Sequence, residues 1–164
     1  MKSAAFTIEQ AQSGDLHEMA DMLFHSELGR KYYPTLQTLE EALAAAFGTD
    51  LMYLLKCGTE TAGFIWFRKN GAFYMYPYLH MVFVREEYRK NGCGRKLLDF
   101  FEQYALNPDG IKKLRSKVFL VVGDWNTNAM KFYERSGYTE VGLLPGLFRK
   151  KVDEHLMMKE CVNL

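Results

Sequence analysis

Apolar and polar residues repeat with two periods along the chain, which predicts a mixture of strands and helices. Strand-like apolar runs lie at residues 6–9, 51–57, 62–68, 73–84, 117–122, 138–143 and 154–159. Helical spacing predicts helices after residues 13–15, after Thr38, over residues 94–104 and over residues 126–136. The predicted order is β-α-α-β-β-β-α-β-α-β-β, which indicates a single mixed α/β (α+β) domain.

Local signals set the expected ends of the first two helices. Residues 13–15 (Ser-Gly-Asp) cap the first helix. Pro34 restricts the residue before it, which predicts a break over residues 30–34. Thr38 and Glu41 are spaced as a capping box, so Thr38 is predicted to cap the second helix, which is predicted to end at Gly48.

Two strand regions carry further information. The dipeptide Asn70-Gly71 is a strong hairpin signal, so a turn is predicted there, before a long strand that contains Pro77. Residues 117–122 (Lys-Val-Phe-Leu-Val-Val) are almost continuously apolar, which is typical of a strand buried on both faces.

Length and composition narrow the class of protein. A chain of 164 residues that is 48% apolar fits one domain, residues 1–164, and argues against intrinsic disorder. The net charge of +1 gives no support to a nucleic-acid-binding protein. No apolar run approaches the roughly 20 residues that span a bilayer, and no signal peptide is expected at the N-terminus.

The cysteines and histidines predict neither a disulfide framework nor a metal site. Cys57, Cys93 and Cys161 lie far apart without C-x-x-C spacing, and the four histidines show no H-x-H or H-E-x-x-H pattern. Free thiols in a reducing cytoplasm are therefore expected.

Charge is distributed unevenly along the sequence. Residues 11–60 carry eight acidic and three basic side chains, a net charge of −5, whereas residues 85–96 carry five basic and two acidic ones, a net charge of +3. The two regions either face partners of opposite sign or are solvated faces that happen to differ.

One stretch carries the candidate chemistry. A strand ends near Val84, and a loop with Gly92 and Gly94 leads directly into a helix. Main-chain N–H groups at a helix start are unpaired and point outward, where the helix dipole is positive. Arg95 and Lys96 oppose that dipole, and a bound polyanion would explain their position. The loop is therefore interpreted as a pyrophosphate-binding loop.

A G-x-G pair alone is equally compatible with an ordinary strand–turn–helix joint. Leu97 excludes the G-x-G-x-x-G dinucleotide motif. The longer string is more specific: Arg89-x-x-Gly92-x-Gly94 resembles the acetyl-CoA loop of the GCN5-related N-acetyltransferase (GNAT) family, which has Arg or Gln, two residues, Gly, one residue, and Gly or Ala.

A second segment supports this resemblance. Residues 126–138 are similar to the family pattern Asn-x-x-Ala-x-x-Phe-Tyr-x-x-x-Gly-Phe, with Tyr138 in place of the last Phe. The segment follows the strand at residues 117–122, as it does in the family. The resemblance covers nearly the whole chain and implies a mixed, mostly antiparallel sheet flanked by helices.

The resemblance also implies a set of residues that bind acetyl-CoA. The strand before the loop would pair with the pantetheine arm, and the loop amides would hold the pyrophosphate. Asn126 would contact the cofactor and is equally suited to cap the following helix, while Cys93 would be a spacer. The implied cofactor-binding residues are Val82, Phe83, Val84, Arg89, Lys90, Asn91, Gly92, Cys93, Gly94, Arg95, Asn126 and Tyr133.

Catalytic roles follow from the same resemblance. Tyr133 matches a tyrosine whose hydroxyl lies near the thioester sulfur, and a phenol of pKa about 10 can protonate a thiolate of pKa about 8.5; a core tyrosine would show the same spacing. His80 replaces the glutamate base of many members, and a structural strand histidine is the alternative, with Glu27 as the reserve base. Tyr32, Tyr33, Tyr76 and Tyr78 are candidates for the acceptor pocket.

The resulting interpretation is an acetyl-CoA-dependent N-acetyltransferase that transfers an acetyl group directly to a primary amine of a small molecule or peptide. The alternatives are a catalytically idle acyl-CoA-binding or sensor domain and a binder of another phosphate compound. The expected location is the cytoplasm. The expected partners include neither nucleic acid nor membrane, and the oligomeric state is left open, with a homodimer as one option.

Overall fold

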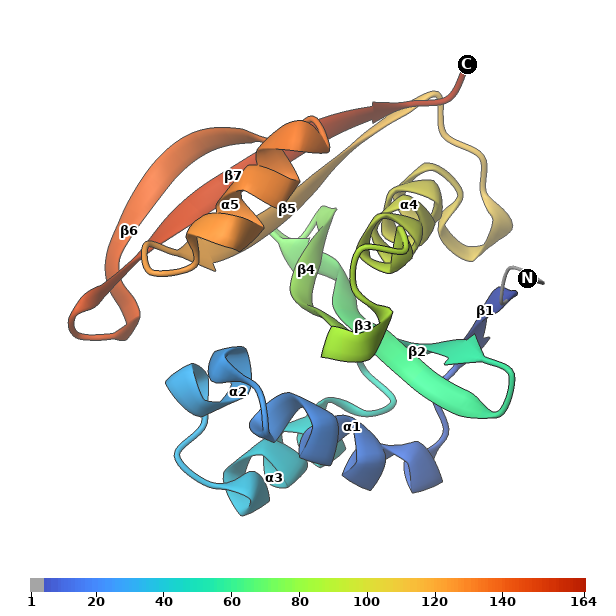
Figure 1. Cartoon of the computed structure of the whole chain (residues 1–164). Coiled ribbons are helices and arrows are strands. Elements are labelled where there is room, and N and C mark those ends of the chain that lie inside the picture. Colours follow the sequence, from blue (N-terminus) through green and yellow to red (C-terminus); the bar gives the residue numbers. More distant parts are fainter. Residues whose placement is uncertain (1–4) are drawn as a thin grey trace. The chain divides into compact units, whose positions relative to one another are not determined.

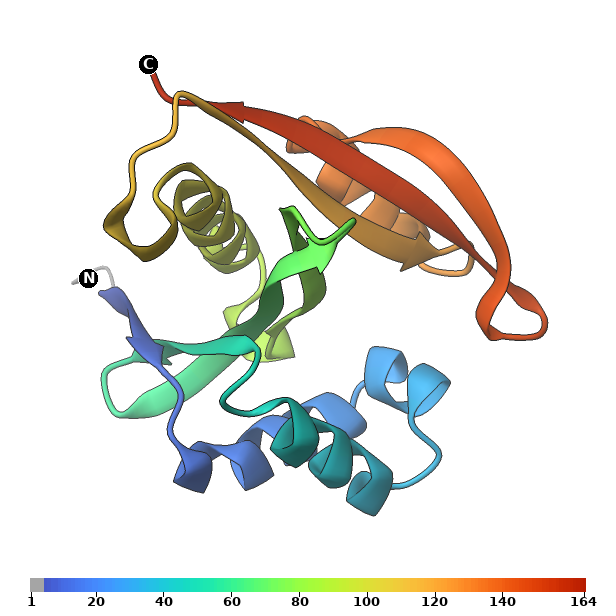
Figure 2. The same ribbon diagram turned by 180° about the vertical axis from the view of Figure 1, so that it is seen from behind.

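The computed structural model describes residues 5–164, which form a seven-stranded mixed sheet and five α-helices (Figures 1 and 2). The strands are β1 (Phe6–Gln10), β2 (Leu51–Cys57), β3 (Glu60–Ala72), β4 (Tyr76–Val84), β5 (Arg115–Gly123), β6 (Thr139–Arg149) and β7 (Val152–Val162). The helices are α1 (Leu16–Phe24), α2 (Glu27–Tyr32), α3 (Leu36–Ala46), α4 (Cys93–Leu106) and α5 (Thr127–Arg135). The strand order is β1-β2-β3-β4-β5-β7-β6.

The chain forms two compact units. Unit 1 comprises Met1–Trp66 and Met81–Leu98, and unit 2 comprises Phe67–His80 and Asp99–Leu164. Strands β3 and β4 and helix α4 each begin in one unit and end in the other. The mixed, mostly antiparallel sheet with flanking helices is the fold class that the sequence predicts.

Unit 1 buries one hydrophobic core between its sheet strands and its N-terminal helices. Strands β1 and β2 pair antiparallel, with Phe6 opposite Cys57 and Gln10 opposite Tyr53. The apolar positions of α1 and α3 that recur at helical spacing, such as Leu23 and Leu39, are fully buried in the core. Amphipathic spacing therefore decides which face of each helix packs inward.

Unit 2 is built around β5. This strand pairs in parallel with β4 at Tyr78 and Leu79, and antiparallel with β7 along its whole length. Residues from both faces of β5 are buried, among them Phe119 and Leu120, which confirms the prediction of a doubly buried strand. Helix α5 covers one face of β5, β7 and β6, and β6 forms the outer edge (Figures 1 and 2).

Two predicted helix boundaries are wrong. Helix α3 begins three residues earlier than predicted, because Thr35 is its N-cap and Thr38 completes the capping box at the third helical position. The predicted break over residues 30–34 is partly helical, since α2 continues to Tyr32, and its C-cap Tyr33 directly precedes Pro34. Ser26, whose side chain accepts from the amide of Gly29, caps α2.

The predicted turn at Asn70-Gly71 is also wrong, because both residues lie inside β3. The chain turns at Phe73 and Tyr74, which adopt positive φ angles of 56° and 59°. A Cβ atom on Gly71 would lie 2.8 Å from the Cβ of Tyr78, so this glycine allows a close approach within the sheet.

The helix and strands after β5 largely follow the prediction. Helix α5 ends at Arg135, followed by Gly137 with a φ of +92°, a conformation that favours glycine at a helix C-terminus. Strands β6 and β7 are longer than predicted. Among residues 5–164, no helix is both long enough and apolar enough to cross a membrane.

Candidate functional site

The loop at residues 89–95 follows β4 and forms the start of α4 in unit 1. The amide of Lys96 donates to the carbonyl of Gly92 at 2.9 Å, which is the first bond of the helical ladder. The amides of Cys93, Gly94 and Arg95 precede that bond, so the helix itself does not use them. Three consecutive N–H donors at a helix N-terminus can hold the oxygens of a phosphate.

Backbone conformation explains one of the two loop glycines. Gly92 has a φ of +73°, and a Cβ atom built there would have no neighbour within 4 Å. Gly92 is therefore required by its backbone conformation, and the space in front of it is open. Lys90 also has a positive φ, of 64°. Two left-handed residues two positions apart give the loop its tight path.

Side chains of the loop bind its own carbonyl groups. The Nε atom of Arg89 donates to the carbonyl of Val84 at 3.0 Å, and Nδ2 of Asn91 donates to the carbonyls of Tyr88 and Arg89. The guanidinium of Arg89 also lies 6.0 Å from the ring centroid of Phe83. Arg89 thus ties the loop to the end of β4, a role that the motif alone does not reveal.

Arg85, the residue after β4, is held by a network of hydrogen bonds. The Nε atom of Arg85 donates to the carbonyl of Thr61 at 2.9 Å, and its Nη2 lies 3.4 Å from Oε1 of Glu18 on α1. The hydroxyl of Thr61 donates to the same carboxylate and accepts from Lys56. These contacts join α1, β2 and β3 to the start of the loop. Sequence reasoning missed them because the partners are far apart in the chain.

The amino-terminal side of the loop is anchored by Tyr88. Its hydroxyl donates to the carboxylate of Glu60, which raises the pKa of Tyr88 to about 12. Its ring contacts Phe6 edge-on, with centroids 6.1 Å apart. No local motif in the sequence points to this residue.

Cys93 is 2% exposed, although it belongs to the loop. Burial raises the pKa of its thiol, and the neighbouring Cys57 acts in the same direction, while Lys96 opposes them. A thiol that remains protonated is a poor nucleophile. Cys93 is therefore not expected to act as a nucleophile.

Unit 2 carries the second motif. Asn126 is the N-cap of α5, and its Oδ1 atom accepts from the amide of Ala129 at 3.2 Å. The cap uses only the side-chain oxygen of Asn126. The side-chain NH₂ group can therefore donate hydrogen bonds to a ligand.

Tyr133 lies on α5, and the residue is 8% exposed. Burial raises the pKa of its phenol, and the neighbouring Tyr78 adds to this effect. Its ring is flanked by Phe132 and Tyr138, at centroid distances of 5.3 Å and 5.7 Å. The phenol is therefore held in a rigid aromatic setting and is neutral over the physiological pH range.

Behind Tyr133 lies a polar group that the sequence did not reveal. The ammonium of Lys159 binds the buried carboxylate of Glu102 at 2.9 Å and lies 5.8 Å from the ring centroid of Tyr138. Burial and the charge of Glu102 both raise the pKa of Tyr138.

The candidate bases differ in their surroundings. His80 is exposed on β4, and its ring lies 6.5 Å from that of Tyr78. Tyr78 therefore neighbours both predicted catalytic residues of unit 2. Glu27 lies in the first turn of α2 in unit 1 and is exposed.

The other candidate acceptor tyrosines are divided between the units. Tyr32 and Tyr33 lie at the end of α2 in unit 1, where burial raises the pKa of Tyr33. Tyr76 begins β4 in unit 2 and packs against Phe119 at 5.7 Å. Among residues 5–164, no group of three or more His, Cys, Asp or Glu side chains has a metal-binding arrangement.

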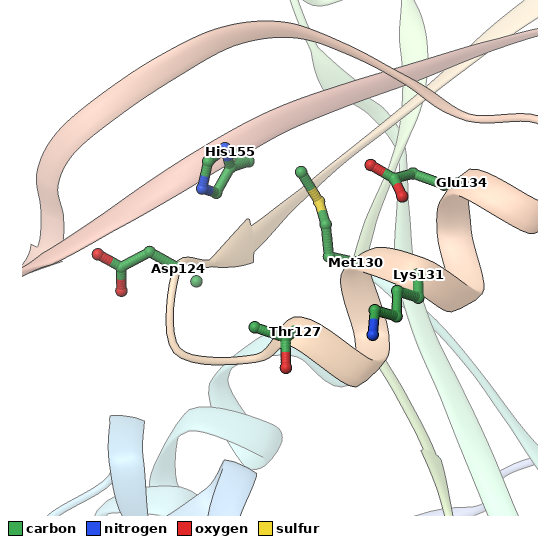
Figure 3. A pocket seen from close by; sticks show the side chains of 7 residues that line it. Asp124, Thr127, Met130, Lys131, Glu134 and His155 are labelled. Atoms are coloured by element: carbon green, nitrogen blue, oxygen red, sulfur yellow. The ribbon is translucent and has the colours of Figure 1, made fainter.

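A pocket in unit 2 was not predicted from the sequence. It has a volume of about 300 Å³ and lies beside α5, the helix that carries Tyr133 (Figure 3). It is lined by Gly123, Asp124, Thr127, Met130, Lys131, Glu134 and His155.

Comparison with known proteins places the chain in a family. Residues 15–138 match the model of the acetyltransferase (GNAT) family, and the chain belongs to this family. A curated relative is the L-ornithine N5-acetyltransferase NATA1 of Arabidopsis thaliana, 35% identical over 79 residues. That match covers 46% of this chain and 32% of the relative, so only about a third of the relative's length is matched.

Solved structures share the fold at low sequence identity. The ribosomal-protein-S18-alanine N-acetyltransferase from Escherichia coli superposes with a TM-score of 0.75 at 18% identity, covering 98% of this chain and 96% of its own. The spermidine N-acetyltransferase from Vibrio cholerae, solved with CoA and spermine, has a TM-score of 0.72 at 17% identity, with 97% of each chain covered.

Proposed function

We propose that residues 1–164 form a single acetyl-CoA-dependent N-acetyltransferase domain that transfers an acetyl group to a primary amine. The observation that carries this proposal is the loop before α4. It presents three amides at a helix start, it is open in front of Gly92, and it carries the glycine spacing of the family to which the chain belongs.

The loop residues suit a pyrophosphate. The amides of Cys93 and Gly94 would donate to its oxygens, and the cationic side chain of Arg95 would balance its charge. The backbone of Val82 and Phe83 would pair with the pantetheine arm as an added strand does. Acetyl-CoA, when bound, supplies the activated acetyl thioester.

Tyr133 is proposed as the general acid. Its raised pKa keeps the phenol protonated, so the hydroxyl has a proton to donate at neutral pH. A thiolate that leaves into apolar surroundings also has a raised pKa, which reduces the mismatch between donor and acceptor. Asn126 would donate its amide hydrogens to a carbonyl of the cofactor.

His80 is proposed as the base that accepts the proton of the acceptor amine, directly or through water. An imidazole has an ordinary pKa of about 6.5, which suits this task near neutral pH. Its exposure on β4 leaves it accessible to solvent. Glu27 is the second candidate, since its carboxylate is also exposed.

The acceptor is proposed to be a cationic amine. The net charge of −5 over residues 11–60 would attract it, and the named substrates of two relatives, ornithine and spermidine, are amines. The expected signature is a specificity constant that falls as salt rises, because screening acts over about 10 Å at 0.1 M salt. A neutral or anionic best acceptor, or a salt-independent specificity constant, would contradict this proposal.

A single assay tests the proposed function. CoA-thiol release is measured with acetyl-CoA and a panel of polyamines, amino acids, aminoglycosides and peptide N-termini. Amine-dependent thiol release supports transfer to an amine. Acetyl-CoA binding without thiol release from any amine would instead support an idle acyl-CoA-binding domain.

We also propose that the chain forms a homodimer in the cytoplasm. Strand β6 is the edge of the sheet and exposes Val141, Leu143 and Leu147, an apolar row that a second copy could cover. All three cysteines are free thiols, as suits a reducing compartment. Light scattering should give a dimer mass, and Leu143→Asp should give a monomer; a monomeric parent protein would contradict the proposal.

A further inference from the structure

A buried ion pair in unit 2 lies outside the groups that the proposed chemistry uses. Oε2 of Glu102 on α4 accepts from Nζ of Lys159 on β7 at 2.9 Å, and the two side chains are 10% and 20% exposed. Removing two charges from water is costly, and a buried ion pair commonly stabilises a fold no more than apolar side chains of similar volume would. Stability alone therefore does not account for a carboxylate and an ammonium at this place.

The ion pair contacts the segment that follows α5. A Cβ atom on Gly137 would lie 3.4 Å from Cε and 3.7 Å from Nζ of Lys159, so the end of the lysine side chain lies beside this glycine. The same ammonium lies 5.8 Å from the ring centroid of Tyr138, a distance typical of a cation–π contact. Burial and the charge of Glu102 raise the pKa of Tyr138, so the carboxylate also acts on this phenol. Both charged groups therefore interact with Tyr138.

Tyr138 is joined to Tyr133 in two ways. Its amide donates to the carbonyl of Tyr133 at 3.0 Å, and the amide of Gly137 donates to the carbonyl of Glu134 at 3.1 Å, which together form a Schellman motif at the end of α5. The rings of Tyr138 and Tyr133 stand edge-on, with centroids 5.7 Å apart. A displacement of Tyr138 therefore disturbs both the main chain and the ring surroundings of Tyr133.

We propose that Glu102 and Lys159 are positioning residues for Tyr133: the ion pair holds Tyr138 in place, and Tyr138 holds the phenol of Tyr133. This inference rests on the proposed role of Tyr133 as the general acid. A general acid must lie within hydrogen-bond reach of the group that it protonates, and a misplacement of about 1 Å can lower a rate by about 10²-fold. An ion pair fixes its neighbours in direction as well as in distance, which apolar packing does less strictly.

Replacement of both charged residues by apolar ones separates positioning from stability. The double variant Glu102→Leu/Lys159→Met leaves no charge unpaired, so its thermal stability should be retained. Its turnover number should fall by about tenfold, with an unchanged KM for acetyl-CoA, because Tyr133 is less well placed. Arg115→Met/Glu160→Leu removes an exposed ion pair that also involves β7, and as the matched control it should change neither quantity. A stable double variant with the turnover number of the parent protein would overturn the proposal.

A double-mutant cycle shows whether the ion pair acts through Tyr133. In a Tyr133→Phe background, the apolar double replacement should lower the turnover number no further, because the proton donor that it places is absent. A further tenfold loss in that background would overturn the proposal, since the pair would then act on another group. If the apolar variant does not fold, Glu102→Gln, which keeps the side-chain volume, undergoes the same two measurements with the same expected results.

The motion of the Tyr133 ring gives a readout that needs no acetyl transfer. NMR of the protein labelled in its tyrosine rings should show flips of the Tyr133 ring that are about tenfold faster in the double variant than in the parent protein, because its packing is looser. Equal flip rates would overturn the positioning role, whether or not the protein releases thiol from acetyl-CoA. Faster flips in a protein whose parent form releases no thiol would instead contradict the proposed function and retain the positioning of Tyr133.

Discussion

The ring of Tyr138 stands edge-on to the ring of Tyr133, with centroids 5.7 Å apart and planes inclined by 63°. On its other side, Tyr138 lies beneath the ammonium of Lys159, which is paired with Glu102. The family pattern has Phe at position 138. The setting of Tyr133 therefore rests on a buried charged pair as well as on apolar packing.

Removing the hydroxyl of Tyr133 should separate chemistry from binding. In Tyr133→Phe, the turnover number should fall by about 10²- to 10⁴-fold, the usual contribution of a general acid, while acetyl-CoA affinity is retained. Steady-state kinetics and calorimetry measure the two quantities. Tyr138→Phe removes a neighbouring hydroxyl and serves as the control, with a smaller expected effect. An unchanged turnover number in Tyr133→Phe would make Tyr133 a core residue.

The pH dependence of turnover offers an independent check on Tyr133. Its pKa is raised above the ordinary 10.0 by burial, so the protonated form that a general acid needs persists as pH rises. Ionisation of Tyr133 should therefore cause no loss of turnover between pH 7 and about 10. A basic limb within this range that disappears in Tyr133→Phe would contradict the raised pKa of Tyr133.

The proposed acetyl-CoA loop should lose its affinity for the cofactor when Gly94 is replaced by a charged residue. In Gly94→Glu, the carboxylate repels phosphate and covers the helix-start amides, so acetyl-CoA binding should be lost while the domain remains folded. Calorimetry and thermal melting measure both. Gly14→Glu is the matched control, because a Cβ atom on Gly14 would have no neighbour within 4 Å and Gly14 lies outside the loop. Retained affinity in Gly94→Glu would exclude the loop as the phosphate site.

Asn126 is expected to cap α5 and also to donate a hydrogen bond to acetyl-CoA, and one substitution can separate these two roles. Aspartate can still accept from the amide of Ala129 and cap α5, but it has no N–H to donate. Asn126→Asp should therefore keep thermal stability and weaken acetyl-CoA about tenfold. Asn126→Ala should also lose about 1 kcal/mol of stability with the cap. Equal acetyl-CoA affinity in the parent and in Asn126→Asp would leave capping as the only role.

The sequence predicts most of the elements because their signals are local. The helical spacing before Phe24 and the continuous apolar run of β5 each describe the environment of their own residues. The turn at Phe73 and Tyr74 could not be predicted, since Asn70-Gly71 is the stronger local signal. Gly71 is instead a glycine because Tyr78, on another strand, approaches it closely.

In the candidate site, too, local motifs could be predicted from the sequence and contacts between distant residues could not. The loop and α5 motifs are contiguous strings, so the sequence alone points to Gly92 and Tyr133. The groups that hold them in place are distant in the chain: Glu18 reaches Arg85, and Glu60 reaches Tyr88. The pocket at Asp124 and His155 likewise joins two segments that are distant in the chain, so no contiguous motif could predict it.

The burial of Cys93 has a consequence for chemical durability. Acetyl thioesters and CoA disulfides acylate or oxidise exposed thiolates, and a cysteine in the proposed acetyl-CoA loop would meet both reagents at close range. With its side chain covered and the pKa of its thiol raised, Cys93 presents little thiolate to react. Burial of Cys93 thus limits modification of its thiol by reagents that would bind at the proposed loop.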